Sequence, residues 1–232
     1  MIKIKVKELK HKYPDGTQAL NGVNIEVVEG EFLAILGANG SGKTTLLKHL
    51  NGLLKPDSGL IILDNKRLND FKPSDVFRKV GMVFQDPNDQ LIAPTVEEDV
   101  AFGPTNLNLG YVEIVSRVNN ALELVKMKEF AKKAIHALSY GQSKRICIAG
   151  ILAMEPEILI LDEVLSVGDE AFQRKCMARM ENFRSGGTTT IFVSHSMDTV
   201  LALCSRVALL DHGRIHTVGS PNEVVEAYRR AQ

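Results

Sequence analysis

The sequence has no tryptophan, only 3 cysteines among its 232 residues, and no apolar run of about 18 residues. Without such a run we expect no membrane-spanning helix, so a membrane role would need a separate membrane subunit. The cysteines, Cys147, Cys176 and Cys204, are widely spaced in apolar surroundings, which favours reduced core thiols of a cytosolic protein over metal ligands. The N-terminus MIKIKVKELK alternates Lys with Ile and Val and lacks the apolar block of a signal peptide.

A net charge is also absent. Lys and Arg together number 28, and Asp and Glu together number 28 as well. No bulk electrostatic field therefore draws the protein to nucleic acid or to an anionic membrane, and such a partner would have to be recognised locally. The length of 232 residues suffices for one large domain or two small ones with a buried core.

The hydrophobic pattern changes along the chain. Residues 2–35 have the pattern of short strands separated by turns at YPDG and VEGE, which predicts an antiparallel beginning. Later, apolar strands alternate with helical stretches, which predicts a mostly parallel sheet covered by helices on both faces. These later strands are expected at residues 79–84, 157–162, 188–193 and 205–210.

Between residues 86 and 140 the strand pattern gives way to helical spacing, as in VEEDVAFGP and VEIVSRVNNALELV. We therefore expect an α/β protein with an antiparallel β subdomain and an inserted helical subdomain. Residues 1–85 and 157–232 would form the α/β core and residues 86–156 the helical subdomain, within a single domain of residues 1–232.

The string GANGSGKTT follows an apolar strand and opens the helix KTTLLKHL. Glycines let a backbone wrap phosphates closely with its N–H groups inward, at the positive end of the helix dipole. Lys43 can then reach the β- and γ-phosphates, and the Thr44 hydroxyl can bind Mg²⁺. The predicted nucleotide-binding residues are Gly37, Asn39, Gly40, Ser41, Gly42, Lys43, Thr44 and Thr45. A glycine-rich turn with a coincidental lysine is the alternative, and the motif alone does not separate a kinase, a GTPase and a motor ATPase.

Two adjacent acids, Asp162 and Glu163, end the apolar run EILIL. In P-loop enzymes an acid at the end of a neighbouring parallel strand holds Mg²⁺, usually through water, which predicts that role for Asp162. Glu163 would lie above the γ-phosphate and act as a general base on water. Without a P-loop, the pair would instead be two solvated acids capping the following helix.

The string LSYGQSKR places a serine and a glycine at the start of a second helix. Hydroxyl and backbone N–H groups converge there at the positive end of the dipole, which predicts a second phosphate-binding helix start built from Ser139, Gly141 and Gln142. Ser139 as a simple N-cap is the alternative, and the two roles are compatible.

LSYGQSKR resembles the LSGGQ signature of ATP-binding-cassette (ABC) ATPases. Val83 to Asp86 resembles the glutamine loop of that family, FVSHSMD with His195 resembles its switch histidine, and Tyr13 in HKYPDGTQAL resembles its adenine-stacking aromatic. Singly, these three could be a loop histidine, a surface amide at Gln85 and a core ring. Six motifs nevertheless occur in the family's order across nearly the whole chain.

The resemblance implies a P-loop fold of the ABC type that binds ATP and Mg²⁺ in a head-to-tail dimer and docks on a transmembrane transporter subunit. It implies a catalytic set of Lys43, Gln85, Glu163 and His195. It implies that the metal is held by Thr44, Gln85 and Asp162. Ser139, Gly141 and Gln142 would act on the ATP of the partner, and Ser166 and Asp169 resemble the family's dimer-contact loop.

The resemblance changes branch along the chain. Val83 to Gly110, and the string from LSYGQ to ILILDE, resemble ATPases of cobalt, nickel and vitamin uptake systems of the energy-coupling-factor type. The continuation VLSVGDEAFQRKC and the residues after it resemble ATPases of polysaccharide, O-antigen and teichoic-acid exporters. A divergent natural homologue and an engineered join near residues 157–162 both account for this change, and the close match of each half to its own branch favours the join.

An ATPase that powers transport, peripheral on the inner face of the cell membrane and with an uptake-type docking surface, is the first function hypothesis. A polysaccharide-exporter ATPase and a nucleotide-binding scaffold with little turnover are its alternatives. A soluble ABC ATPase of DNA repair or translation is disfavoured, because the sequence has no coiled-coil insertion, second cassette or basic bias.

Overall fold

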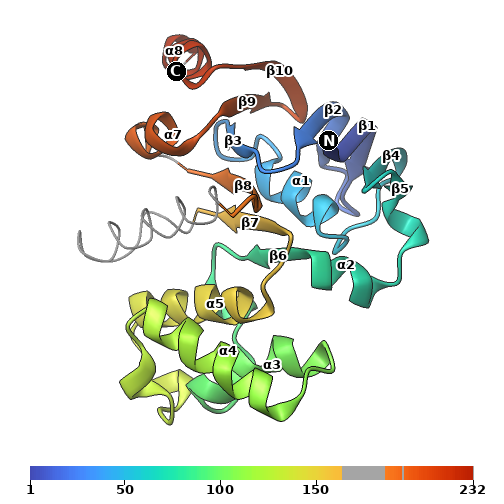
Figure 1. The fold of residues 1–232 in the computed structure, drawn as a ribbon. Coiled ribbons are helices and arrows are strands. Elements are labelled where there is room, and N and C mark those ends of the chain that lie inside the picture. Colours follow the sequence, from blue (N-terminus) through green and yellow to red (C-terminus); the bar gives the residue numbers. More distant parts are fainter. Residues whose placement is uncertain (164–185, 195, 232) are drawn as a thin grey trace.

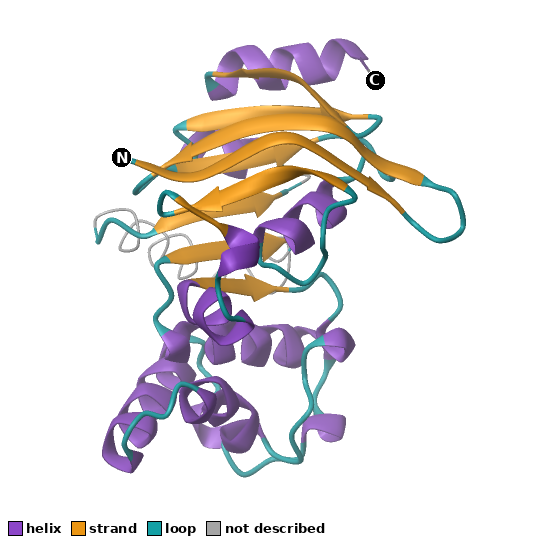
Figure 2. Cartoon of the chain, turned by 90° about the vertical axis from the view of Figure 1, so that its right-hand side faces the viewer, coloured by secondary structure: helices purple, strands orange, loops and turns teal. Residues whose placement is uncertain are grey.

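A computed structural model describes residues 1–163, 186–194 and 196–231 (Figure 1). Its strands form a four-stranded and a six-stranded sheet. Figures 1 and 2 show both sheets in one β-rich part of the molecule, with a group of helices below it and the C-terminal helix on top. In the described ranges no helix is both long and apolar enough to cross a membrane.

The four-stranded sheet has the order β2-β1-β4-β5, and all of its strand pairs are antiparallel. Its strands are β1 (Ile2–Lys12), β2 (Gln18–Val28), β4 (Ser58–Leu63) and β5 (Lys66–Arg67). The antiparallel beginning is therefore confirmed, but β1 and β2 are 11 residues each and not short. Irregularities in the register, as between Val6 and Leu9, interrupt the ladder between these two strands.

The six-stranded sheet has the order β10-β9-β3-β8-β7-β6. All neighbours are parallel except β10, which runs antiparallel to β9. The strands are β3 (Phe32–Leu36), β6 (Val80–Val83), β7 (Ile158–Asp162), β8 (Thr189–Val193), β9 (Arg206–Asp211) and β10 (Arg214–Gly219).

Both faces of this sheet are buried. Ile158 and Ile160 of β7 pack with β1, β2, β4 and the helix after β3, whereas Leu159 and Leu161 pack on the opposite face with the helical group. Successive side chains of a strand point to opposite faces, so a strand covered on both sides needs an unbroken apolar run. The predicted fold class, an α/β fold with a mostly parallel sheet, is confirmed.

The described helices are α1 (Lys43–Leu50), α2 (Pro73–Lys79), α3 (Val96–Asn106), α4 (Tyr111–Leu124), α5 (Tyr140–Met154), α7 (Met197–Leu203) and α8 (Pro221–Ala231). Helices α3, α4 and α5 gather beside the β6 edge of the sheet (Figures 1 and 2). This leaves the carboxyl ends of β3 and β7, and the turns that follow them, as the place where the predicted site residues meet.

Candidate functional site

The predicted phosphate loop connects β3 to α1, so the strand, loop and helix follow in the expected order. Two of its glycines have backbone neighbours too close for a side chain. A Cβ on Gly37 would lie 2.1 Å from the Leu210 carbonyl oxygen, and one on Gly42, at φ 103°, would lie 2.4 Å from the Ala19 carbonyl oxygen. The loop is thus a tight backbone cradle that requires glycine at these positions.

Lys43, the first residue of α1, turns back over this loop. Its Nζ donates to the carbonyl oxygens of Gly37 and Ala38, both at 2.9 Å, and the residue is only 7 % exposed. Burial lowers the pKa of the ammonium, and the neighbouring Glu163 and Asp162 oppose this effect. A buried ammonium held by neutral carbonyls of its own loop is suited to bind an anion there.

Asp162 ends β7 and is 1 % exposed. Neither of its carboxylate oxygens accepts a hydrogen bond of ordinary geometry from the described residues, although the Thr44 hydroxyl lies close enough to favour the charged form. Burial is the main cause that raises the pKa of this carboxyl above its ordinary value, and the Glu163 charge adds to the rise. An orphaned buried carboxylate beside a threonine hydroxyl fits a hard divalent cation such as Mg²⁺.

Glu163 follows directly and has a left-handed backbone, with φ 53°. Its N–H donates to the Val193 carbonyl oxygen at 3.2 Å, and its Oε2 accepts from Gln85 Nε2 at 2.6 Å. Gln85 comes just after β6, so the sheet brings together two predicted residues that are 78 positions apart. The structure thus gathers Lys43, Asp162 and Glu163, with Gln85 at the same edge.

Tyr13 lies in the turn between β1 and β2 and is half-buried. Its hydroxyl is 3.1 Å from Thr45 Oγ1 on α1, so the predicted adenine-stacking ring lies beside the phosphate-loop helix. Its ring also meets the ring of His11 edge to face, with 4.9 Å between centroids, and His11 in turn contacts His49 of α1 at 4.7 Å. The stacking role of Tyr13 stays a prediction.

The predicted second phosphate-binding helix start is the N-terminus of α5. Ser139 Oγ accepts from the Gln142 N–H at 3.3 Å, and Gln142 Oε1 accepts from the Ser139 N–H at 3.0 Å. These reciprocal bonds form a capping box, so the N-cap alternative holds in this structure. The serine is exposed and Gly141 is half-buried, which leaves room for a ligand at this end.

Several predicted residues lie outside the described residues, namely Ser166, Asp169, Cys176 and His195. The other two cysteines, Cys147 and Cys204, are buried, as the sequence predicts. Burial raises the pKa of the Cys147 thiol to about 12, which makes it a poor nucleophile and metal ligand.

Two residues that contact the site were not predicted. The Tyr140 hydroxyl donates to the Gln85 carbonyl oxygen at 3.4 Å, and Lys144 Nζ donates to the Glu163 carbonyl oxygen at 3.5 Å. The available signal was their spacing of four in YGQSK, which places both side chains on one face of a helix.

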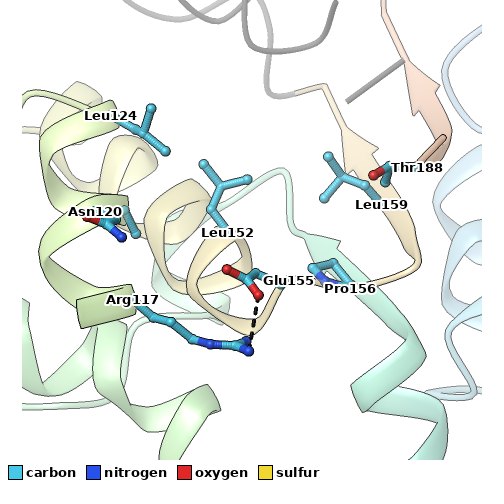
Figure 3. Close-up of a pocket in the computed structure, with 9 residues that line it drawn as sticks. Arg117, Asn120, Leu124, Leu152, Glu155, Pro156, Leu159 and Thr188 are labelled. Atoms are coloured by element: carbon cyan, nitrogen blue, oxygen red, sulfur yellow. Dashed lines mark ion pairs between the residues drawn. The ribbon is translucent and has the colours of Figure 1, made fainter. Parts of the chain in front are cut away.

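Two cavities adjoin the helical group. The larger, of about 610 Å³, lies between β6 and helices α3 and α5, and its mainly apolar lining includes Phe84, Phe102 and Ile151. The smaller, of about 330 Å³, lies between α4, α5 and the start of β7. Figure 3 shows Arg117 of α4 pointing to Glu155 at the end of α5, with 3.1 Å between Nη2 and Oε2. The ion pair between Arg117 and Glu155 thus lines this second cavity at the C-terminal end of α5.

The site can therefore bind a polyphosphate on the loop, place a cation at Asp162 and Thr44, and hold a carboxylate at Glu163 beside them. Removal of a proton from water by that carboxylate would permit attack on the terminal phosphate.

A family model described as ABC transporter matches residues 20–166. The chain is 46% identical over 226 residues to the energy-coupling factor transporter ATP-binding protein EcfA of Methanococcus maripaludis, covering 97% of this chain and 81% of that protein. EcfA of Methanocaldococcus jannaschii is 43% identical, covering 100% of this chain and 85% of its own length.

Among solved structures, that of cbiO1 from Clostridium perfringens, part of the ABC transporter complex cbiONQ, is 40% identical with a TM-score of 0.82 and covers 99% of this chain and 92% of its own. A dimeric ATP-binding cassette in a post-hydrolysis state bound to ADP and Pi is 29% identical with a TM-score of 0.83 and covers 94% of this chain and 98% of its own. The alignments to the uptake-type relatives run through both halves of the sequence.

Proposed function

The chain belongs to the ABC transporter family, as an ATPase subunit, and from this premise we propose that it powers an uptake transporter of the energy-coupling factor type through the site at the ends of β3 and β7. The observation that carries the proposal is the orphaned carboxylate of Asp162, 1 % exposed, beside a buried lysine whose ammonium donates to neutral loop carbonyls. Both charges are matched by Mg²⁺ and the phosphates of ATP.

In the proposed mechanism Lys43 leaves the carbonyl oxygens of Gly37 and Ala38 and binds the β- and γ-phosphates. The backbone N–H groups of the loop bind the same phosphates at the start of α1. Thr44 and Asp162 would hold Mg²⁺, which would supply positive charge to the phosphates as negative charge shifts to the leaving group. Asn39, Gly40 and Ser41 complete the cradle, and Tyr13 stacks on adenine.

Glu163 is the proposed general base. It accepts a proton from water, the water oxygen forms a bond to the γ-phosphorus, and the bond to the β-bridging oxygen breaks to release ADP. Its Oε2 accepts a hydrogen bond from the Gln85 amide, so we expect Gln85 to move away from this oxygen when Glu163 accepts the proton. His195 and Asp169 are assigned to the same site by resemblance alone.

The second phosphate-binding surface belongs to the partner subunit in this proposal. Ser139 and Gln142 form a capping box at the start of α5, and in this proposal that start meets the ATP of another copy or a paralogue in a head-to-tail dimer. The dimer would open after hydrolysis, because charge repulsion separates the product phosphates. The assignment of residues 86–156 as the unit that carries this surface remains part of the proposal.

The apolar groove of about 610 Å³ is the proposed docking surface for the transmembrane subunit. It is continuous with the glutamine loop, because Phe84 and Gln90 line it, and its rim exposes Ile92 by 65 % and Phe102 by 52 %. A docked helix would therefore contact the loop that holds Gln85. In this proposal the protein lies on the inner face of the membrane when assembled.

The uptake type is favoured over the exporter type because relatives named as energy-coupling factor subunits align with at least 97% of this chain. A join near residues 157–162 stays a hypothesis that these continuous alignments do not support. The transported compound, cobalt, nickel or a vitamin, is selected by other subunits.

Steady-state phosphate release tests the enzymatic part. We expect turnover that requires both ATP and Mg²⁺, and a protein that binds ATP without releasing phosphate would be a scaffold instead. Co-expression with membrane subunits of the energy-coupling type and of the exporter type tests the docking part. Retention by the exporter subunits alone would contradict the uptake assignment.

A further inference from the structure

Two side chains from the first turns of α5 reach the catalytic residues of their own subunit. Tyr140 donates its hydroxyl to the Gln85 carbonyl oxygen at 3.4 Å, and Lys144 donates to the Glu163 carbonyl oxygen at 3.5 Å. Their spacing of four residues brings them together on the helix, with Lys144 Nζ 5.2 Å from the centroid of the Tyr140 ring. The two contacts thus act as one cluster.

Lys144 is 6 % exposed, so its ammonium has lost most of its contact with water. In the described part of the chain its ammonium contacts the Glu163 carbonyl and the face of the Tyr140 ring. A buried charge is costly unless such groups stabilise it, which means that the ammonium fixes the positions of both groups.

The residue that Lys144 contacts is also held in an unfavourable backbone conformation. Glu163 has φ 53°, and a residue other than glycine keeps such a conformation only where its surroundings fix it. The Val193 carbonyl accepts from its N–H at 3.2 Å, and Lys144 Nζ lies 3.5 Å from its carbonyl oxygen. The direction of the Glu163 side chain depends on this backbone, so Lys144 contributes to where the carboxylate points.

We propose that Tyr140 and Lys144 are positioning residues that hold Gln85 and Glu163 of their own subunit for hydrolysis. This inference rests on the proposed function. The same helix begins at Ser139, which faces the ATP of the partner in the proposed dimer, so α5 connects the two ATP sites. When ATP bound to the partner contacts the start of α5, the position of Glu163 in the subunit that contains this α5 would therefore change.

Substitutions separate this role from ATP binding. We expect Lys144→Met to lower kcat about tenfold and Tyr140→Phe about threefold, with the KM for ATP unchanged because neither residue belongs to the proposed ATP-binding set. Lys144→Arg should restore most of the rate, since it keeps a charged donor. Tyr111→Phe is the matched control, because Tyr111 is 81 % exposed on α4 and its variant should keep full turnover.

Mixed dimers test whether the action is on the subunit's own site. One subunit carries Glu163→Gln and a different affinity tag, so only the site with the remaining Glu163 turns over. Single-turnover phosphate release is then measured with Lys144→Met in either subunit. We expect about tenfold slowing when it lies in the subunit that keeps Glu163, and less than about twofold when it lies in the other.

The opposite pattern would mean that the cluster acts directly on the partner's ATP, and it would overturn the inference. Equal slowing in both arrangements, or none in either, would overturn it as well. A reference mixed dimer without the Lys144 substitution that releases no phosphate would instead contradict the proposed function. The two failures are thus distinguishable.

Discussion

The two ends of strand β7 carry buried or partly buried charges in opposite arrangements. Glu157, just before the strand, takes part in a network in which every charge has opposite charges beside it. Asp162, at the end of the strand, has two carboxylate oxygens with no hydrogen-bond partner among the described residues. The five-residue strand β7 therefore has paired charges before its first residue and a carboxylate without a hydrogen-bond partner at its last residue.

The network at the start of β7 joins the two sheets. Lys3 of β1 lies 2.8 Å from Asp64 and 2.6 Å from Glu157, and Lys79 of α2 lies 2.8 Å from each of the same acids. Each charge is thus opposed by two others, and the pKa of each group shifts in the direction that favours its charged form. The four charges of this network therefore neutralise one another.

At the other end of β7 the pKa values of the charged groups shift in the direction that favours their neutral forms. Burial raises the pKa of the Asp162 carboxyl and lowers the pKa of the Lys43 ammonium, so both charged forms are disfavoured. A ligand with complementary charge removes this penalty on binding.

The largest effect on ATP turnover is expected at Glu163, which directly follows β7. We expect Glu163→Gln to lower ATP turnover by about 10² to 10⁴-fold, because the amide cannot accept the proton from water. ATP binding should persist, and the variant should elute as an ATP-dependent dimer in size-exclusion chromatography. Turnover close to that of the unmodified protein would remove Glu163 from the general-base role.

A smaller effect is expected at the paired end. Asp64→Asn leaves Lys3 and Lys79 with one acid, and asparagine tolerates the left-handed backbone at this position, φ 50°. We expect a loss of about 1–2 kcal/mol in the free energy of unfolding, measured in urea. Glu123→Gln in the exposed pair with Lys128 is the control and should change the free energy by less than about 0.5 kcal/mol. Equal losses in both variants would mean that the network is not a stabilising unit.

The groups at the two ends of β7 are also expected to change the stability of the protein with pH in opposite directions. The depressed pKa values of Asp64 and Glu157 contribute stability that is present above their ordinary values of 3.8 and 4.5 and is lost as the pH falls below them. The raised pKa values of Lys3 and Lys79 contribute stability below 10.5 that is lost at higher pH. Asp162 has the opposite sign, because its raised pKa lowers stability as the pH rises from 3.8.

Denaturation in urea between pH 3 and pH 7 measures this difference. We expect the acid loss of stability to be smaller in Asp64→Asn, whose network is already broken, and larger in Asp162→Asn, which lacks the opposing contribution. An identical pH profile in the two variants would contradict the contrast between the ends of β7.

The local parts of this account were predictable from the sequence. The apolar run before Asp162 marks a strand buried on both faces, and the glycines before Lys43 mark a loop that must pass close to other backbone. Both follow from the chemistry of a few neighbouring residues. The meeting of Asp162 with Thr44 was predictable too, since parallel strands bring their carboxyl ends to one edge.

Contacts between distant segments were not predictable. Lys3 and Glu157 are 154 positions apart, and each alone has the pattern of an exposed charge. The bond between Gln85 and Glu163 depends on the pairing of β6 with β7, and the reach of Lys144 to Glu163 depends on how α5 packs beside the sheet. The lengths of β1 and β2 were underestimated because their irregular register interrupts the alternation of apolar residues. Packing decides these features, and a single sequence does not reveal it.

Thermal unfolding of Asp162→Asn beside the unmodified protein tests the central claim most directly. Without nucleotide we expect the variant to melt about 2–4 °C higher, because it lacks a buried, unpaired carboxylate worth about 1 kcal/mol. With Mg²⁺ and a non-hydrolysable ATP analogue the order should reverse, because only the unmodified protein gains from the filled site. A variant that melts lower than the unmodified protein without nucleotide would contradict the claim that this end of β7 is left unsatisfied for its ligand.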